Sequence, residues 1–161
     1  MATEIRALDN AADAAGCDAV VRSLPYFFGD EDGLRQCAAA VRSEQGWVAA
    51  DAGAIVGFVT AAPAFPESLE VTWLAVRADR RRAGIGRRLV ERVAAAGALE
   101  GFGLLCTLTL GPSVEEPGVE DGYEGTRRFW RRVGFLPVKE LGLAAWNDEH
   151  ALLLVRPLGR G

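Results

Sequence analysis

A short basic segment with two glycines holds the clearest chemistry in the sequence. In residues 76–93, "VRADRRRAGIGRRLVERV", Gly84 and Gly86 stand at the start of an amphipathic pattern. The first amides of a helix lack partners inside the helix and carry a partial positive charge, and glycine leaves them open to a ligand. The segment therefore predicts an anion site suited to phosphate or pyrophosphate. The basic side chains that add charge beside it are Arg81, Arg82 and Arg87.

Two common nucleotide-binding motifs do not fit this segment. A Walker loop needs Gly-Lys-Ser/Thr after the glycines, and a dinucleotide fingerprint needs a third glycine three residues on. Neither is present in residues 81–90. The glycine pair alone also fits a helix that starts at glycine behind a solvated basic turn, so both interpretations stay open on spacing alone.

Composition narrows the class of protein. The chain has 161 residues and a formal net charge of −4. An acidic balance disfavours a nucleic-acid binder, which usually carries a basic footprint. The start "MATEIRALDN" lacks a signal-peptide pattern, and no apolar run is long enough to span a bilayer. We expect a cytoplasmic protein without membrane or nucleic-acid partners.

The residues that bind metals or form disulfides are scattered. Cys17, Cys37 and Cys106 are far apart and lack CxxC spacing, which is typical of reduced core thiols. His150 is the single histidine. No metal site is expected, because these residues offer no ligand cluster.

Hydrophobic periodicity and turn residues predict strands that alternate with helices. The expected strands are residues 3–8, 46–51, 54–63, 68–76, 103–110, 135–141 and 150–158. The expected helices are residues 10–24, 32–44, 84–97 and 123–133, the last ending at Gly134. Strand 103–110 is almost wholly apolar, as expected where both faces of a sheet are covered. This order predicts a single α/β domain over residues 1–161.

The sequence resembles the GNAT superfamily of acyl-CoA-dependent N-acetyltransferases. Residues 81–86, "RRAGIG", match the signature Arg/Gln-x-x-Gly-x-Gly/Ala. The stretch "EVTWLAVRADRR" looks like the family's fourth strand and its exit, and "TRRFWRRVGF" looks like its fourth helix. The turn "LPYFFGDEDG" resembles a bacterial subgroup with a Leu-Pro-x-x-Phe-Gly motif. Together the matches cover nearly the whole chain in the right order.

The resemblance implies a fold and a co-substrate. The expected fold is a mixed, mostly antiparallel sheet with a splayed central pair of parallel strands, flanked by helices. Acetyl-CoA would lie with its pantetheine arm along the strand-edge amides of Leu74, Ala75 and Val76. The amide of Val76, or its neighbour, would polarise the thioester carbonyl. The residues implied to hold the pyrophosphate are Arg81, Arg82, Ala83, Gly84, Ile85, Gly86 and Arg87.

The resemblance also implies a general base on strand 68–76. Acetyl transfer needs a neutral amine, so a base must remove a proton. Glu70 matches the carboxylate position often used in the family, and Glu67 is a weaker candidate. Strand alternation is expected to place Glu70 on one face with Thr72, Leu74 and Val76. An ordinary exposed glutamate is the alternative reading of Glu70.

The general acid is less well defined. The family's usual tyrosine, four residues before the Gly-Phe pair, is Trp130 in this chain. An indole N–H is not a practical proton source, and we expect Trp130 to pack in the core. Tyr123, two turns earlier, is the substitute acid, and Ser113 is another donor. Water could also reprotonate the thiolate leaving group.

Together these features predict an N-acetyltransferase that acts by direct attack in a ternary complex. The acceptor is the primary amine of a small molecule, or a lysine or N-terminal amine. Acidic loops at residues 29–32 and 115–121 favour a cationic acceptor. The alternative is a non-catalytic acyl-CoA-binding sensor or scaffold, which Trp130 keeps open. The resemblance also allows a homodimer, although the sequence fixes no interface.

Overall fold

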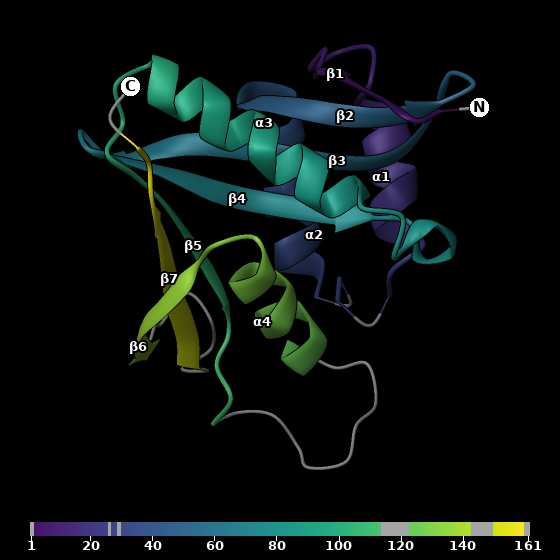
Figure 1. Cartoon of the computed structure of the whole chain (residues 1–161). Coiled ribbons are helices and arrows are strands. Elements are labelled where there is room, and N and C mark those ends of the chain that lie inside the picture. Colours follow the sequence, from purple (N-terminus) through teal and green to yellow (C-terminus); the bar gives the residue numbers. More distant parts are fainter. Residues whose placement is uncertain (1, 26, 29, 114–122, 143–149, 160–161) are drawn as a thin grey trace. The chain divides into compact units, whose positions relative to one another are not determined.

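The computed structural model describes residues 2–25, 27–28, 30–113, 123–142 and 150–159. The strands are Glu4–Ala7 (β1), Gln45–Asp51 (β2), Ala54–Phe65 (β3), Ser68–Val76 (β4), Leu104–Leu110 (β5), Leu136–Gly142 (β6) and His150–Pro157 (β7). The helices are Ala14–Arg22 (α1), Glu31–Ser43 (α2), the short 3-10 turn Ala78–Arg80 (η1), Ile85–Leu99 (α3) and Tyr123–Arg132 (α4). Figure 1 shows their arrangement.

The described strands form one seven-stranded mixed sheet in the order β1-β2-β3-β4-β5-β7-β6. β4 and β5 run parallel and pair over residues 68–70 and 104–106. The pairs β1–β2, β2–β3, β5–β7 and β6–β7 are antiparallel. The α/β prediction with a central parallel pair is confirmed.

Backbone contacts divide the chain into two units. The first unit holds Met1–Pro63 and Val71–Ala96, and the second holds Ala64–Glu70 and Gly97–Gly161. The expectation of a single domain over residues 1–161 therefore stays a prediction. No helix in the described part of the chain is long and apolar enough to cross a membrane.

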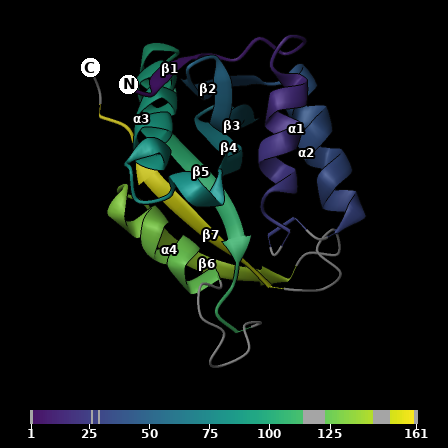
Figure 2. The ribbon, with the colours of Figure 1, turned by 90° about the vertical axis from the view of Figure 1, so that its right-hand side faces the viewer.

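In the first unit, helices cover both faces of the sheet. Figure 2 shows α1 and α2 side by side on one face of β2–β4 and α3 on the other. The core under α1 and α2 includes Cys17, Val20, Val41, Val48 and Phe58, all nearly inaccessible to solvent. The β2–β3 turn is formed by two left-handed residues, Ala52 and Gly53.

In the second unit, α4 packs against the β5–β7–β6 sheet. The helix ends where expected, at Gly134, whose φ of 92° is left-handed. The amide of Phe135 then bonds to the carbonyl of Trp130 at 2.9 Å, which closes the helix end. Both side chains enter the core of this unit.

Two elements differ from the expectation. The helix predicted from residue 10 begins only at Ala14, because the Asp9 carboxylate accepts hydrogen bonds from the amides of Ala11 and Ala12 and holds a turn. Burial alternates along β5, so this strand is not covered equally on both faces. Residues 26 and 29 of the "LPYFFGDEDG" turn, and the acidic loop 115–121, lie outside the described residues.

Candidate functional site

The loop in front of α3 has a backbone that few side chains tolerate. Arg82 has a φ of 65° and Gly84 a φ of 76°, both left-handed. A Cβ added to Gly84 would meet no atom within 4 Å. The first helical bond that closes on this loop runs from the amide of Arg88 to the carbonyl of Gly84 at 3.1 Å. The amides of Ile85 and Gly86 precede it, so no bond within the helix uses them.

The charges of the loop fall into two groups. Arg77 pairs with Asp79 at 2.9 Å, and Arg80 pairs with Asp51 at 2.5 Å. Arg81 and Arg82 are exposed, and no carboxylate in the described residues pairs with either. Arg81 instead lies over the ring of Phe27, 5.2 Å from its centroid. The loop therefore keeps the charge needed for an anion.

A glycine in β3, which the sequence analysis did not single out, lets α3 approach the sheet. A Cβ on Gly57 would lie 3.1 Å from the carbonyl oxygen of Ala75. It would also lie 3.3 Å from Val76 Cγ2 and 3.4 Å from Ile85 Cγ2. The start of α3 is thus seated beside the end of β4. The sequence signal that could have predicted this close approach is a lone glycine inside an apolar strand.

The end of β4 is hydrogen-bonded to β3. The amide of Arg77 bonds to the carbonyl of Val56 on β3 at 2.9 Å. Alternate residues of a regular strand direct their N–H groups to the same side, so the amide of Val76 is expected on the edge away from β3. The contacts of Leu74, Ala75 and Val76 with a pantetheine arm stay predictions.

The expected side-chain alternation of β4 is wrong. Val76 faces α3, as its approach to Ile85 shows. Thr72 faces the other side, where its hydroxyl meets Thr60 and Glu44, and Ala75 packs into the core under α1 and α2. Thr72 and Ala75 are three residues apart and share a face, so alternation breaks between them. Such a break is a β-bulge, which redirects side chains and commonly lies beside functional sites.

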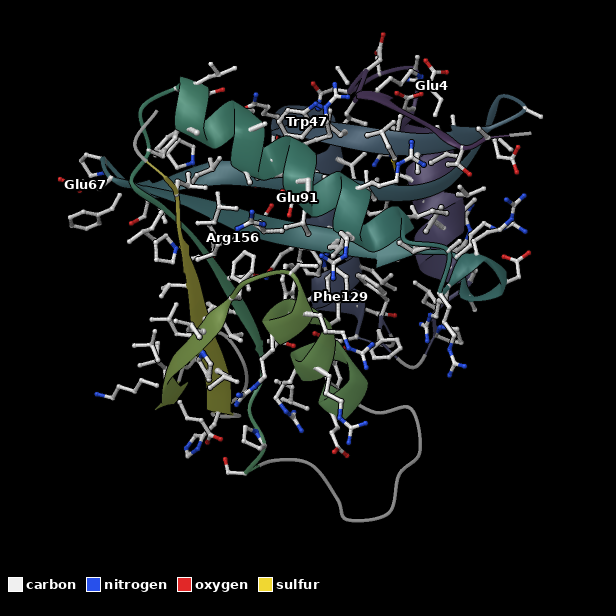
Figure 3. All side chains as sticks on the ribbon, in the orientation of Figure 1. Glu4, Trp47, Glu67, Glu91, Phe129 and Arg156 are labelled. Carbon is white, nitrogen blue, oxygen red and sulfur yellow. The ribbon has the colours of Figure 1, made fainter. Side chains whose placement is uncertain are left out.

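The candidate base lies on the paired part of β4. Glu70 is half-buried and stands opposite Cys106 in the parallel ladder. Glu67 is exposed at the tip of the β3–β4 turn, at the other end of the strand from Val76 (Figure 3). The position of Glu70 is therefore closer to the strand-end amides than that of Glu67.

The cysteines are unsuited to covalent catalysis. Burial, and next the charge of Glu70, raise the pKa of Cys106 to about 11. Burial raises the pKa of Cys17 and of Cys37 to about 12. The thiolate is the nucleophilic form, so all three are inert thiols near neutral pH. Cys17 and Cys37 are core residues as expected, whereas Cys106 is only half-buried.

Trp130 is a core residue. It is 5% exposed and lies edge-on to Phe129 and Phe135, with ring centroids 5.2 and 4.9 Å away. The expected packing role is confirmed. Tyr123 is the half-buried first residue of α4, on a different element from Glu70. Its role as acid stays a prediction.

Ser113, Glu140 and His150 form a hydrogen-bonded cluster that sequence reasoning missed. The Ser113 hydroxyl donates to Glu140 Oε2 at 2.5 Å, and His150 Nδ1 lies 3.2 Å from the same oxygen. The bond from Ser113 is the main cause that lowers the pKa of Glu140. His150 Nδ1 also lies 3.1 Å from the Ser113 hydroxyl oxygen, but the hydroxyl donates its hydrogen bond to the carboxylate, so histidine is not its base as in a catalytic triad. Among the described residues, no three His, Cys, Asp or Glu side chains gather as metal ligands.

A mixed α/β sheet and a glycine loop that opens a helix are typical of folds that bind an anion at a helix N-terminus. A family model described as an acetyltransferase (GNAT) domain matches residues 42–137, more than half of the chain. The chain belongs to the GNAT acetyltransferase family.

Solved structures share this fold at low sequence identity. A GNAT-family protein from Desulfovibrio desulfuricans is 22% identical with a TM-score of 0.78, over 98% of this chain and 100% of that chain. Ard1 from Thermoplasma volcanium is 16% identical with a TM-score of 0.75, over 99% of each chain. An aminoglycoside 6′-N-acetyltransferase complexed with coenzyme A is 18% identical with a TM-score of 0.73, over 97% of each chain. No curated protein matches the sequence.

Proposed function

We propose that the protein is an acetyl-CoA-dependent N-acetyltransferase that acts on a primary amine by direct attack in a ternary complex. The acceptor is a small molecule, or a lysine or N-terminal amine. The loop of Arg82 and Gly84 in front of α3 carries the proposal. Its left-handed residues, its open space and its exposed guanidinium groups suit the diphosphate of coenzyme A. Membership of the GNAT family supports the same reaction.

The coenzyme would lie along the end of β4. The diphosphate would be held by the residues that the sequence analysis assigned to it, 81–87. The amides of Leu74 and Val76 would bond to the pantetheine arm and the thioester carbonyl. Since Ala75 packs into the core under α1 and α2, its part is to hold the strand there.

In the proposed reaction Glu70 takes a proton from the acceptor ammonium, directly or through a water. The amine nitrogen then forms a bond to the thioester carbonyl carbon, and the Val76 amide donates to the developing oxyanion. The C–S bond breaks, the nitrogen gives its second proton to water as the amide forms, and the coenzyme thiolate takes a proton from Tyr123 or from water. Tyr123 regains its proton from the solvent. The inert thiols favour this route over an acyl-enzyme.

One observation favours a second candidate function, a non-catalytic acyl-CoA-binding module. Trp130 replaces the family's usual tyrosine and is buried among aromatic rings, so it supplies no proton. Such a module would need the loop before α3 but not Glu70. Both candidates bind acetyl-CoA, and they differ only in turnover.

Release of free thiol from acetyl-CoA in the presence of a panel of primary amines separates the two candidates. The enzyme releases thiol with at least one amine, and Glu70→Gln lowers kcat by about tenfold or more while acetyl-CoA affinity stays the same. Full turnover in that variant removes Glu70 as base. Acetyl-CoA binding without thiol release from any amine supports the binding module.

A further inference from the structure

The C-terminal end of α2 holds a carboxylate in an unfavourable electrostatic position. Glu44 is the C-cap residue, and the carbonyl end of a helix already carries partial negative charge. The basic residue of the last turn, Arg42, pairs instead with Asp18 at 2.7 Å. No arginine or lysine of the described residues forms an ion pair with Glu44. This half-buried negative charge therefore lacks a counter-charge from the described chain.

A chain of hydroxyl groups fixes this carboxylate beside β4. The Thr72 hydroxyl donates to Glu44 Oε2 at 2.5 Å. The hydroxyl oxygens of Thr60 and Thr72 are 2.8 Å apart, and Thr60 must donate, because Thr72 gives its proton to Glu44. Oε2 is thus occupied, whereas Oε1 has no hydrogen bond to the described residues. The geometry leaves one oxygen of a pre-positioned carboxylate for a ligand.

An indole follows this hydroxyl network along β4. Trp73 follows Thr72 in the chain, is half-buried and packs against the core under α1 and α2. Its ring lies 5.9 Å from that of Phe28, at an interplanar angle of 35°. The face of an indole attracts cations, and a carboxylate forms charge-assisted hydrogen bonds with them. Together the two groups are suited to an alkylammonium ion.

The spacing along β4 relates this position to the proposed acetyl-transfer site. Thr72 precedes Leu74 and Val76 by two and four residues, about 7 and 13 Å at the strand rise. We propose that Glu44, with Thr72 and Trp73, binds a second ammonium group of the acceptor. The proposal rests on the proposed function and narrows its substrate class to amines with two or more cationic groups.

Calorimetric titration with cadaverine and with n-pentylamine tests this proposal without turnover. The two probes share a carbon chain and differ in the second ammonium group. We expect the wild-type protein to bind cadaverine about tenfold or more tightly than n-pentylamine. Glu44→Gln, which keeps an acceptor for Thr72 but removes the charge, should abolish this preference. Glu31→Gln, at the other end of α2, is the matched control and should retain it.

Equal affinity of the wild-type protein for both probes overturns the proposal, as does no binding of cadaverine or an unchanged preference in Glu44→Gln. If that variant fails to melt cooperatively, Trp73→Leu takes its place and should weaken cadaverine more than n-pentylamine. Failure of the proposed function is a separate result. In that case the diamine preference and its loss in Glu44→Gln remain, but no amine releases thiol from acetyl-CoA.

Discussion

Gly53 and Gly84 have the same backbone requirement in different places. Their φ angles are 86° and 76°, and a Cβ on either would meet no atom within 4 Å. Gly53 belongs to the β2–β3 turn, whereas Gly84 precedes α3. Substitutions at both glycines strain a left-handed backbone, but only a substitution at Gly84 also fills the space proposed for a ligand. Comparing the two variants therefore distinguishes the two effects.

Leucine at either position should lower the free energy of unfolding by about 1–2 kcal/mol through backbone strain. Only Gly84→Leu should also weaken acetyl-CoA binding, by about tenfold or more, because its side chain enters the space in front of the helix amides. Isothermal titration and urea unfolding measure the two effects. Unchanged affinity in Gly84→Leu, or equal losses of affinity in both variants, contradicts the coenzyme site.

At the scale of elements, the approach of α3 to the sheet depends on the absence of one side chain. Gly57→Ala places a Cβ 3.1 Å from a backbone oxygen, so β3, β4 or α3 must move. We expect a loss of about 1–3 kcal/mol in stability, typical of overpacking, and weaker acetyl-CoA binding because the helix start shifts. Thermal melting and coenzyme titration give the two quantities.

Gly125→Ala is the control for this substitution. Gly125 lies in α4, and an added Cβ meets nothing within 4 Å. Alanine there should leave coenzyme affinity unchanged and stabilise the protein by up to about 1 kcal/mol. If Gly57→Ala also leaves coenzyme affinity unchanged and does not lower stability, the position of α3 against the sheet does not depend on Gly57.

Periodicity and turn residues predicted the elements that position the site, because those signals are local. β4 matches its predicted bounds, and Gly134 ends α4 as expected. The bulge in β4 escaped prediction, since the face that each side chain takes depends on neighbours such as Thr60 and Glu44, which are distant in sequence. The burial of Trp130, in contrast, could be predicted, because a large apolar side chain on the apolar stripe of a helix is a local signal.

At the scale of the whole molecule, one partly buried ion pair makes the stability of the fold depend on pH in the acid range. Arg6 on β1 holds both carboxylate oxygens of Asp13 at 2.8 Å, and Asp13 is 6% exposed. The hydrogen bonds from Arg6 are the main cause that lowers the pKa of Asp13. A depressed pKa stabilises the folded state above the unfolded value of about 3.9, and this contribution is lost as the pH falls through the folded value.

Asp13→Asn should therefore be less stable than the wild type at pH 7, with a difference that shrinks as the pH falls below about 4. Urea unfolding across this pH range measures it. Asp32→Asn is the control, because its ion pair with Arg35 is largely exposed and should contribute little. A constant difference between Asp13→Asn and the wild type at all pH values rules out the linkage.

The two outermost strands, β1 and β6, have a consequence for behaviour at high concentration. β1 is only four residues long. β6 contains Pro137, which has no N–H to donate, and its pairing with β7 shifts between Pro137 and Lys139. Short, irregular or proline-bearing rims are poor templates for a further chain. We therefore expect that the folded protein rarely forms fibrils by strand addition, because its edge strands offer few regularly spaced backbone N–H groups for pairing.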